Sequence, residues 1–136
     1  MKLVFAEERI QFLENEIKEI SSWLDKRTGI PQNRLKELIS KISSNLSEIS
    51  SLQFKVEKTK VEKAFDEGRS IRQAELFRDE LLLRAKINQN IAAAVVKNED
   101  SEVDIDSYYF QSEEIRKLSS DIAQKICLLK YTEDLV

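Results

Sequence analysis

The residues best suited to specific chemistry lie near the middle of the chain, where arginines and carboxylates alternate. The set consists of Arg72, Arg78, Asp79 and Arg84. Glu80 precedes Arg84 by four residues, which is the favourable orientation for an ion pair on a helix. Surface ion pairs with Glu75 and Glu80 account for the pattern. The alternative is that Arg78 and Asp79 lie at a contact between copies of the chain and set its register, so the set is a candidate oligomer interface.

A second group of carboxylates lies in the acidic segment 98–107, where oxygen-bearing side chains recur at about every second residue. Such a run resembles the start of a calcium-binding loop. The sixth position, however, is Val103 where glycine is required, and the twelfth is Tyr109 where a bidentate glutamate is required. The segment is better interpreted as a solvated connection whose negative charges favour the start of the next helix.

The remaining composition excludes most kinds of catalytic site. The chain has no histidine, which rules out Ser-His and Cys-His pairs and His-containing zinc sites. Gly29 and Gly68 are isolated, whereas a phosphate-binding loop needs closely spaced glycines. The single cysteine, Cys127, can form neither an intramolecular disulfide nor a thiolate cluster. We therefore predict a protein that is not an enzyme and uses no metal or cofactor.

Charge and hydropathy indicate the compartment and the kinds of partner. The 22 basic and 25 acidic residues are interleaved, so no basic patch for nucleic acid is visible. The N-terminal apolar run is too short for a signal peptide, and the longest apolar run, residues 91–96, is far below the ~20 residues that cross a bilayer. We expect a cytoplasmic protein with neither a nucleic-acid nor a membrane partner.

The elements that must position these residues are long helices. The chain is 41% apolar and 35% charged with only two glycines and one proline, too few turn residues for a domain of several short strands. Hydrophobic periodicity predicts an all-α fold, an antiparallel four-helix bundle with long amphipathic, coiled-coil-like helices, in a single domain 1–136. The four helices are expected at residues 3–27, 31–65, 71–97 and 108–131.

Local signals mark several helix ends. Gly29 suits the left-handed position after the first helix, and Pro31 suits the start of the second. Ser70 and Gln73 match the capping box that begins a helix. The predicted inner positions are Leu3, Ala6, Ile10, Leu13, Ile17, Ile20 and Leu24 in the first helix; Leu35, Ile39, Ile42, Leu46, Ile49, Leu52 and Val56 in the second; Ile71, Ala74, Phe77, Leu81, Ala85, Ile87, Ile91 and Val95 in the third; and Ile115, Leu118, Ile122, Ile126 and Leu129 in the fourth.

The third helix carries more apolar surface than one neighbour can cover. Residues 81–83 and 91–96 are apolar most of the way round the helix, as in a helix that is packed on several sides. We therefore expect a homo-oligomer, or binding to an unidentified protein partner. The predicted function is that of a non-enzymatic self-assembly or protein-interaction protein.

The middle of the chain also resembles a known family. The residues of segment 66–74, followed by Arg78-Asp79 and Leu83-Arg84, are similar to the central segment of the septicolysin-like family of small bacterial proteins. The resemblance spans most of the chain and implies a helical protein of unknown function, with no catalytic residues. The family label implies membrane damage, so the alternative function is that of a membrane-active cytolysin-like protein. The mixed charges of the helices and the single Trp23 argue against a membrane-surface helix.

Overall fold

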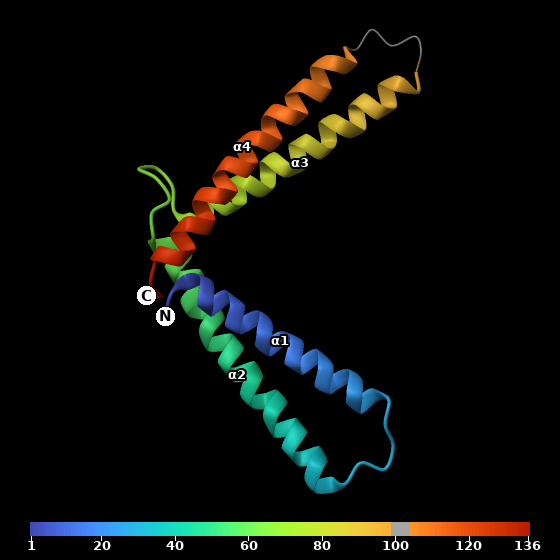
Figure 1. Cartoon of the computed structure of the whole chain (residues 1–136), viewed down its shortest axis with the longest axis vertical. Helices are drawn as coiled ribbons and strands as arrows, with labels where there is room; N and C mark the ends of the chain where they lie inside the picture. Colours follow the sequence, from blue (N-terminus) through green and yellow to red (C-terminus); the bar gives the residue numbers. More distant parts are fainter. Residues whose placement is uncertain (99–103) are drawn as a thin grey trace. The chain divides into compact units, whose positions relative to one another are not determined.

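The computed structural model describes residues 1–98 and 104–136, and these residues form four helices and no strand (Figure 1). The helices are α1 (Leu3–Asp25), α2 (Gln32–Glu62), α3 (Ile71–Val96) and α4 (Ile105–Thr132). Successive helices run in opposite directions, as one hairpin of α1 with α2 and another of α3 with α4. The predicted fold class, an all-α bundle of long antiparallel helices, is confirmed.

The chain divides into two compact units, which we describe separately. The first unit comprises Met1–Lys60 together with Lys130–Val136, and the second comprises Val61–Leu129. The single domain expected from the sequence stays a prediction.

A seam of apolar side chains between α1 and α2 forms the core of the first unit. In α1, Leu3, Ala6 and Leu13 are buried and the other predicted inner residues are half-buried, so the predicted stripe is confirmed. In α2 the prediction is wrong at two positions, because Ile39 and Leu46 are 52% and 53% exposed.

A buried polar residue explains this correction in α2. Leu38 and Asn45 occupy the seam in place of Ile39 and Leu46, and each is only 7% exposed. The Nδ2 group of Asn45 donates a hydrogen bond to Oε1 of Glu16 over 2.9 Å, so this buried amide has a partner on α1. Apolar periodicity places an asparagine outside, and it therefore selects the wrong neighbour at both positions.

Ion pairs along one edge of the hairpin support the same antiparallel register. Nε of Arg9 donates to Oε1 of Glu48 over 2.9 Å. One helical turn pair further along, Nζ of Lys41 lies 3.5 Å from Oε1 of Glu16. These flanking pairs join α1 to α2 on the same side as the Asn45 bond, as charged flanks do in coiled coils.

The connection between α2 and α3 begins earlier than predicted. α2 ends at Glu62, whereas the periodicity predicts its end at Phe65. The Phe65 N–H donates to the Arg69 carbonyl over 2.8 Å, and the Asp66 carboxylate accepts bonds from the Gly68 N–H and the Arg69 guanidinium. These local acceptors turn the backbone back on itself in place of another helical turn.

The predicted helix-end signals are confirmed. Gly29 has a φ of 68°, the left-handed conformation that glycine adopts without steric cost. The Pro31 carbonyl accepts a bond from the Leu35 N–H over 3.0 Å as α2 begins. At the start of α3, Ser70 Oγ accepts from the Gln73 N–H over 3.2 Å, and Gln73 Oε1 accepts from the Ser70 N–H over 2.9 Å. This is the reciprocal capping box expected from the sequence.

Small side chains form part of the seam between α3 and α4 in the second unit. Ala85 and Ala92 are fully buried on α3, and Ser112 and Ser119 are 1% and 2% exposed on α4. Oγ of Ser112 donates to the Ala85 carbonyl over 3.0 Å. Residues of this size let two helix backbones approach closely, so the seam is narrow.

Two predicted inner residues of this unit are therefore wrong. Ile87 on α3 and Leu118 on α4 are each 47% exposed. Ser119 lies in the seam beside Leu118, and a serine is not recognised as an inner residue by apolar periodicity.

α4 begins at Ile105, three residues before its predicted start at Tyr108. The Asp104 carboxylate accepts bonds from the N–H groups of the second and third helical residues, at 3.1 and 3.3 Å, and so caps the helix. The acidic segment 98–107 is thus shorter than predicted at its C-terminal end. Its residues 99–103, which include the calcium-loop comparison at Val103, lie outside the described residues.

Candidate interaction surface

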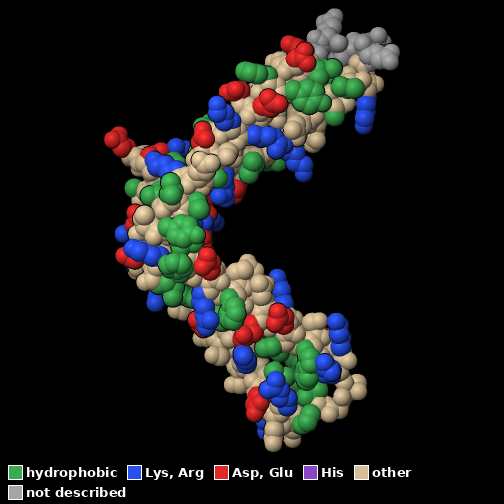
Figure 2. Space-filling model, in the orientation of Figure 1, with side chains coloured by type: hydrophobic (Ala, Val, Ile, Leu, Met, Phe, Trp, Pro, Cys, Tyr) green, Lys and Arg blue, Asp and Glu red, His purple; other side chains and the backbone are tan. Residues whose placement is uncertain are grey.

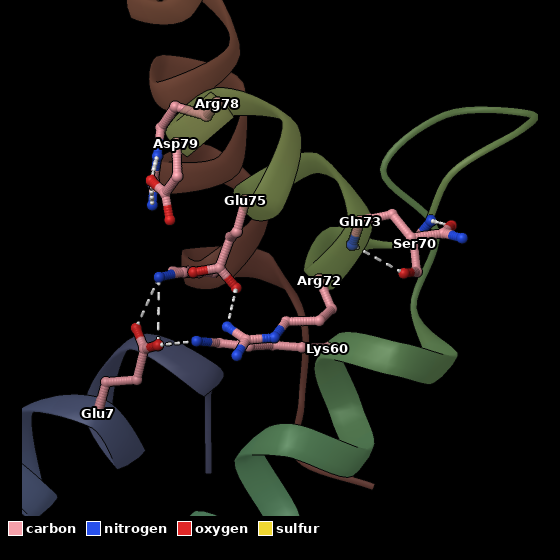
Figure 3. Close-up of polar contacts among 9 residues, drawn as sticks. Glu7, Lys60, Ser70, Arg72, Gln73, Glu75, Arg78 and Asp79 are labelled. Carbon is pink, nitrogen blue, oxygen red and sulfur yellow. Dashed lines mark hydrogen bonds and ion pairs between the residues drawn. The ribbon is translucent and has the colours of Figure 1, made fainter. Parts of the chain in front are cut away.

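All the residues of the predicted interface set lie on α3, where they make local ion pairs. Nη2 of Arg84 donates to Oε1 of Glu80 over 2.8 Å, which confirms the predicted pairing of these two residues. Nη1 of Arg72 lies 3.9 Å from Oε1 of Glu75 (Figure 3). The side chains of Arg72 and Arg84 are 40% and 64% exposed, so neither arginine is enclosed.

Arg78 and Asp79 contact each other but lie on different sides of the helix. Arg78 lies in line with the seam residues Ala74 and Leu81, at steps of four and three, and its side chain is 25% exposed. Asp79 is 60% exposed, and its Oδ1 lies 3.0 Å from Nη2 of Arg78 (Figure 3). Of the two, only Asp79 is placed for contact with a further protein. The interface role of the set stays a prediction.

The face of α3 that points away from α4 carries a second heptad-like row, which we call the α3 outer row. Its members are Leu76, Glu80, Leu83, Ile87, Asn90 and Ala94. Leu83 and Ile87 each lie two residues from Ala85, about 200° around the helix from the seam. Leu76, Leu83 and Ile87 are 57%, 58% and 47% exposed. Figure 2 shows apolar side chains at several places on one face of the second unit, among charged side chains.

An ionic cluster in the first unit was missed by the sequence analysis. The Glu7 carboxylate on α1 contacts Nζ of Lys60 at 2.7 Å and Nζ of Lys130 at 3.0 Å (Figure 3). The side chains are 29%, 8% and 18% exposed, respectively. The three residues are far apart in the sequence, and each looks like an ordinary surface charge, so no local signal identifies the cluster.

The cluster sets the charge state of Glu7. Burial by itself would raise the pKa of this carboxyl group, but the hydrogen bonds from Lys60 and Lys130 outweigh it and hold the pKa below its ordinary value. Beside the cluster, the two ends of the chain lie side by side (Figure 1). The Leu3 N–H donates to the Glu133 carbonyl over 2.9 Å. The arrangement joins α1, α2 and the C-terminal segment, which suits a structural role.

The lowered pKa of Glu7 predicts sensitivity to acid. A carboxyl group with a lower pKa in the folded state stabilises the fold above its unfolded pKa, about 4.3 for glutamate, and this stability is lost as the pH falls toward the folded value. We expect the melting temperature, followed by circular dichroism, to fall as the pH is lowered from about 5 to 3. Hydrogen bonds from Asn45, Arg9 and Arg69, respectively, also lower the pKa values of Glu16, Glu48 and Asp66.

Glu7→Gln tests the contribution of the cluster to this acid sensitivity. The variant cannot gain a proton at this position, so its melting temperature should depend less on pH over the same range. An equally steep dependence in Glu7→Gln and in the parent chain would mean that the cluster contributes nothing to acid sensitivity.

The described residues offer no enclosed site for a substrate. The largest groove, about 820 Å³, lies along α1 and α2 and is open to solvent, with charged and hydroxyl side chains on its walls. In residues 1–98 and 104–136, no group of three or more His, Cys, Asp or Glu side chains is placed to hold a metal ion. Within the same residues, none of the helices has the length and hydropathy needed to cross a membrane.

These features define a class of protein: an all-α chain of two antiparallel helical hairpins with exposed apolar side chains outside the hairpin seams. No protein family, curated protein or solved structure was found to match the chain. The resemblance to the septicolysin-like family therefore stays a prediction, and so does the membrane-active alternative that it implies.

Proposed function

We propose that the protein is a non-enzymatic, cytoplasmic helical protein that assembles with copies of itself or with another protein. The observation that supports this function best is the α3 outer row, in which Leu76, Leu83 and Ile87 are about half exposed on one face. Rows of exposed apolar side chains, bordered by polar residues, are typical of protein-interaction surfaces. α3 already buries its other face against α4, so the outer row is not needed to close the hairpin seam.

Sedimentation equilibrium of the purified chain at physiological salt tests the proposal. We expect either a mass that is a multiple of 15.8 kDa or, after affinity purification from the native cells, a second protein bound in stoichiometric amount. A chain that sediments at 15.8 kDa and is recovered alone would contradict the proposed function.

Substitution of Asp79 tests the proposed register role of the polar set. Asp79→Leu should leave the helical circular dichroism unchanged, because the side chain is exposed, but it should change the mass of the assembly. Asp121→Leu, at an exposed aspartate on α4, is the matched control and should leave the mass unchanged. An unchanged mass in Asp79→Leu would show that Asp79 does not set the register.

A further inference from the structure

The α3 outer row has the spacing of a complete coiled-coil seam. Its six members follow one another at steps of four, three, four, three and four residues, from Leu76 to Ala94, and all six are exposed. This alternation keeps a row on one face of a helix and matches the inner positions of a heptad repeat. α3 therefore carries two seams, one buried against α4 and one facing outward.

We propose that the α3 outer row packs antiparallel against the same row of a second copy of this chain, with a two-fold axis close to Ala85. In this register Leu83 lies opposite Ile87 of the second copy. Glu80 lies opposite Asn90, and Leu76 lies opposite Ala94. A two-fold axis repeats each of these pairs, so the assembly closes as a dimer. The inference rests on the proposed function and names its partner and its surface.

The pairs are complementary in size and in polarity. Two branched apolar side chains meet at the centre, and at the ends the large Leu76 meets the small Ala94. The Asn90 amide can donate a hydrogen bond to the Glu80 carboxylate, so the polar members meet each other. A parallel arrangement in register would place each residue opposite its own copy and would bring two Glu80 carboxylates together in an apolar seam, which costs free energy.

The charges that border the row are balanced within each copy. Asp79 and Glu80 are acidic, whereas Arg84 and Lys86 are basic. Arg84 lies near the proposed axis, and its 2.8 Å bond to Glu80 offsets the repulsion between the two copies of Arg84. Asp79 borders the row, which accounts for the effect expected from Asp79→Leu.

The first experiment measures the mass of the whole chain by sedimentation equilibrium. The parent chain should be a dimer, and Leu83→Glu should sediment at 15.8 kDa with unchanged helical circular dichroism, because it places a carboxylate opposite Ile87. Leu128→Glu is the matched control, since Leu128 is 69% exposed on α4 and lies outside the row. A Leu83→Glu variant that keeps the parent mass would overturn the inference while leaving the proposed function intact. A parent chain at 15.8 kDa that also binds no other protein would overturn both.

The second experiment tests the antiparallel register through Asn90. Asn90→Glu places two carboxylates opposite each other and should raise the dimer dissociation constant about tenfold, whereas Asn90→Lys faces Glu80 and should lower it. In a parallel dimer each residue would face its own copy, so both variants would weaken association. Weakening by both variants would therefore overturn the antiparallel arrangement.

Discussion

Glu7→Ala should destabilise the first unit by about 2–3 kcal/mol, a value below the usual loss for a fully buried ion pair because Glu7 is 29% exposed. The substitution removes the carboxylate that lies between two ammonium groups and leaves Lys60 and Lys130 close together with like charges. Urea unfolding at pH 7, followed by circular dichroism, measures the loss as a shift of the midpoint.

Glu8→Ala is the matched control for this prediction. Glu8 is the exposed neighbour of Glu7 on α1, so its removal changes the net charge by the same amount without touching the cluster. Its effect should stay within about 0.5 kcal/mol. Equal midpoints for the two variants would mean that the cluster is no more than a set of surface charges.

Ala85→Leu should destabilise the second unit by about 1–3 kcal/mol, because the seam between α3 and α4 has no room for a larger side chain. Ala85 is fully buried, and its carbonyl accepts the hydrogen bond from Ser112 over 3.0 Å. A leucine at this position would push the two helix backbones apart and lengthen that bond. Thermal unfolding should show a lower melting temperature for the variant.

Ala93→Leu provides the comparison within the same helix. Ala93 is exposed, so the same change of residue type adds no side chain to the seam and alters helix propensity equally little. We expect its melting temperature to match that of the parent chain. If Ala85→Leu were as stable as Ala93→Leu, the close packing of α3 on α4 would be wrong.

The sequence predicted the interface set as a group on one helix, and the structure divides that group. The pairing of Glu80 with Arg84 was predictable because it depends only on a four-residue spacing. The seam-side position of Arg78 was not, because it depends on which face of α3 packs against α4. The apolar part of the surface was recognised in the sequence as an excess of apolar residues, but Ile87 was assigned to the wrong face.

The sequence by itself determined the four helices, the capping box at Ser70 and the left-handed turn at Gly29, because each depends on residues within a few positions of one another. Only the tertiary structure decided which face of each helix is buried. Asn45 lies inside because Glu16 accepts its hydrogen bond, and Glu7 is enclosed by lysines from two other segments. Such choices depend on the fit between side chains that are far apart in the chain, and hydrophobic periodicity carries no information about that fit.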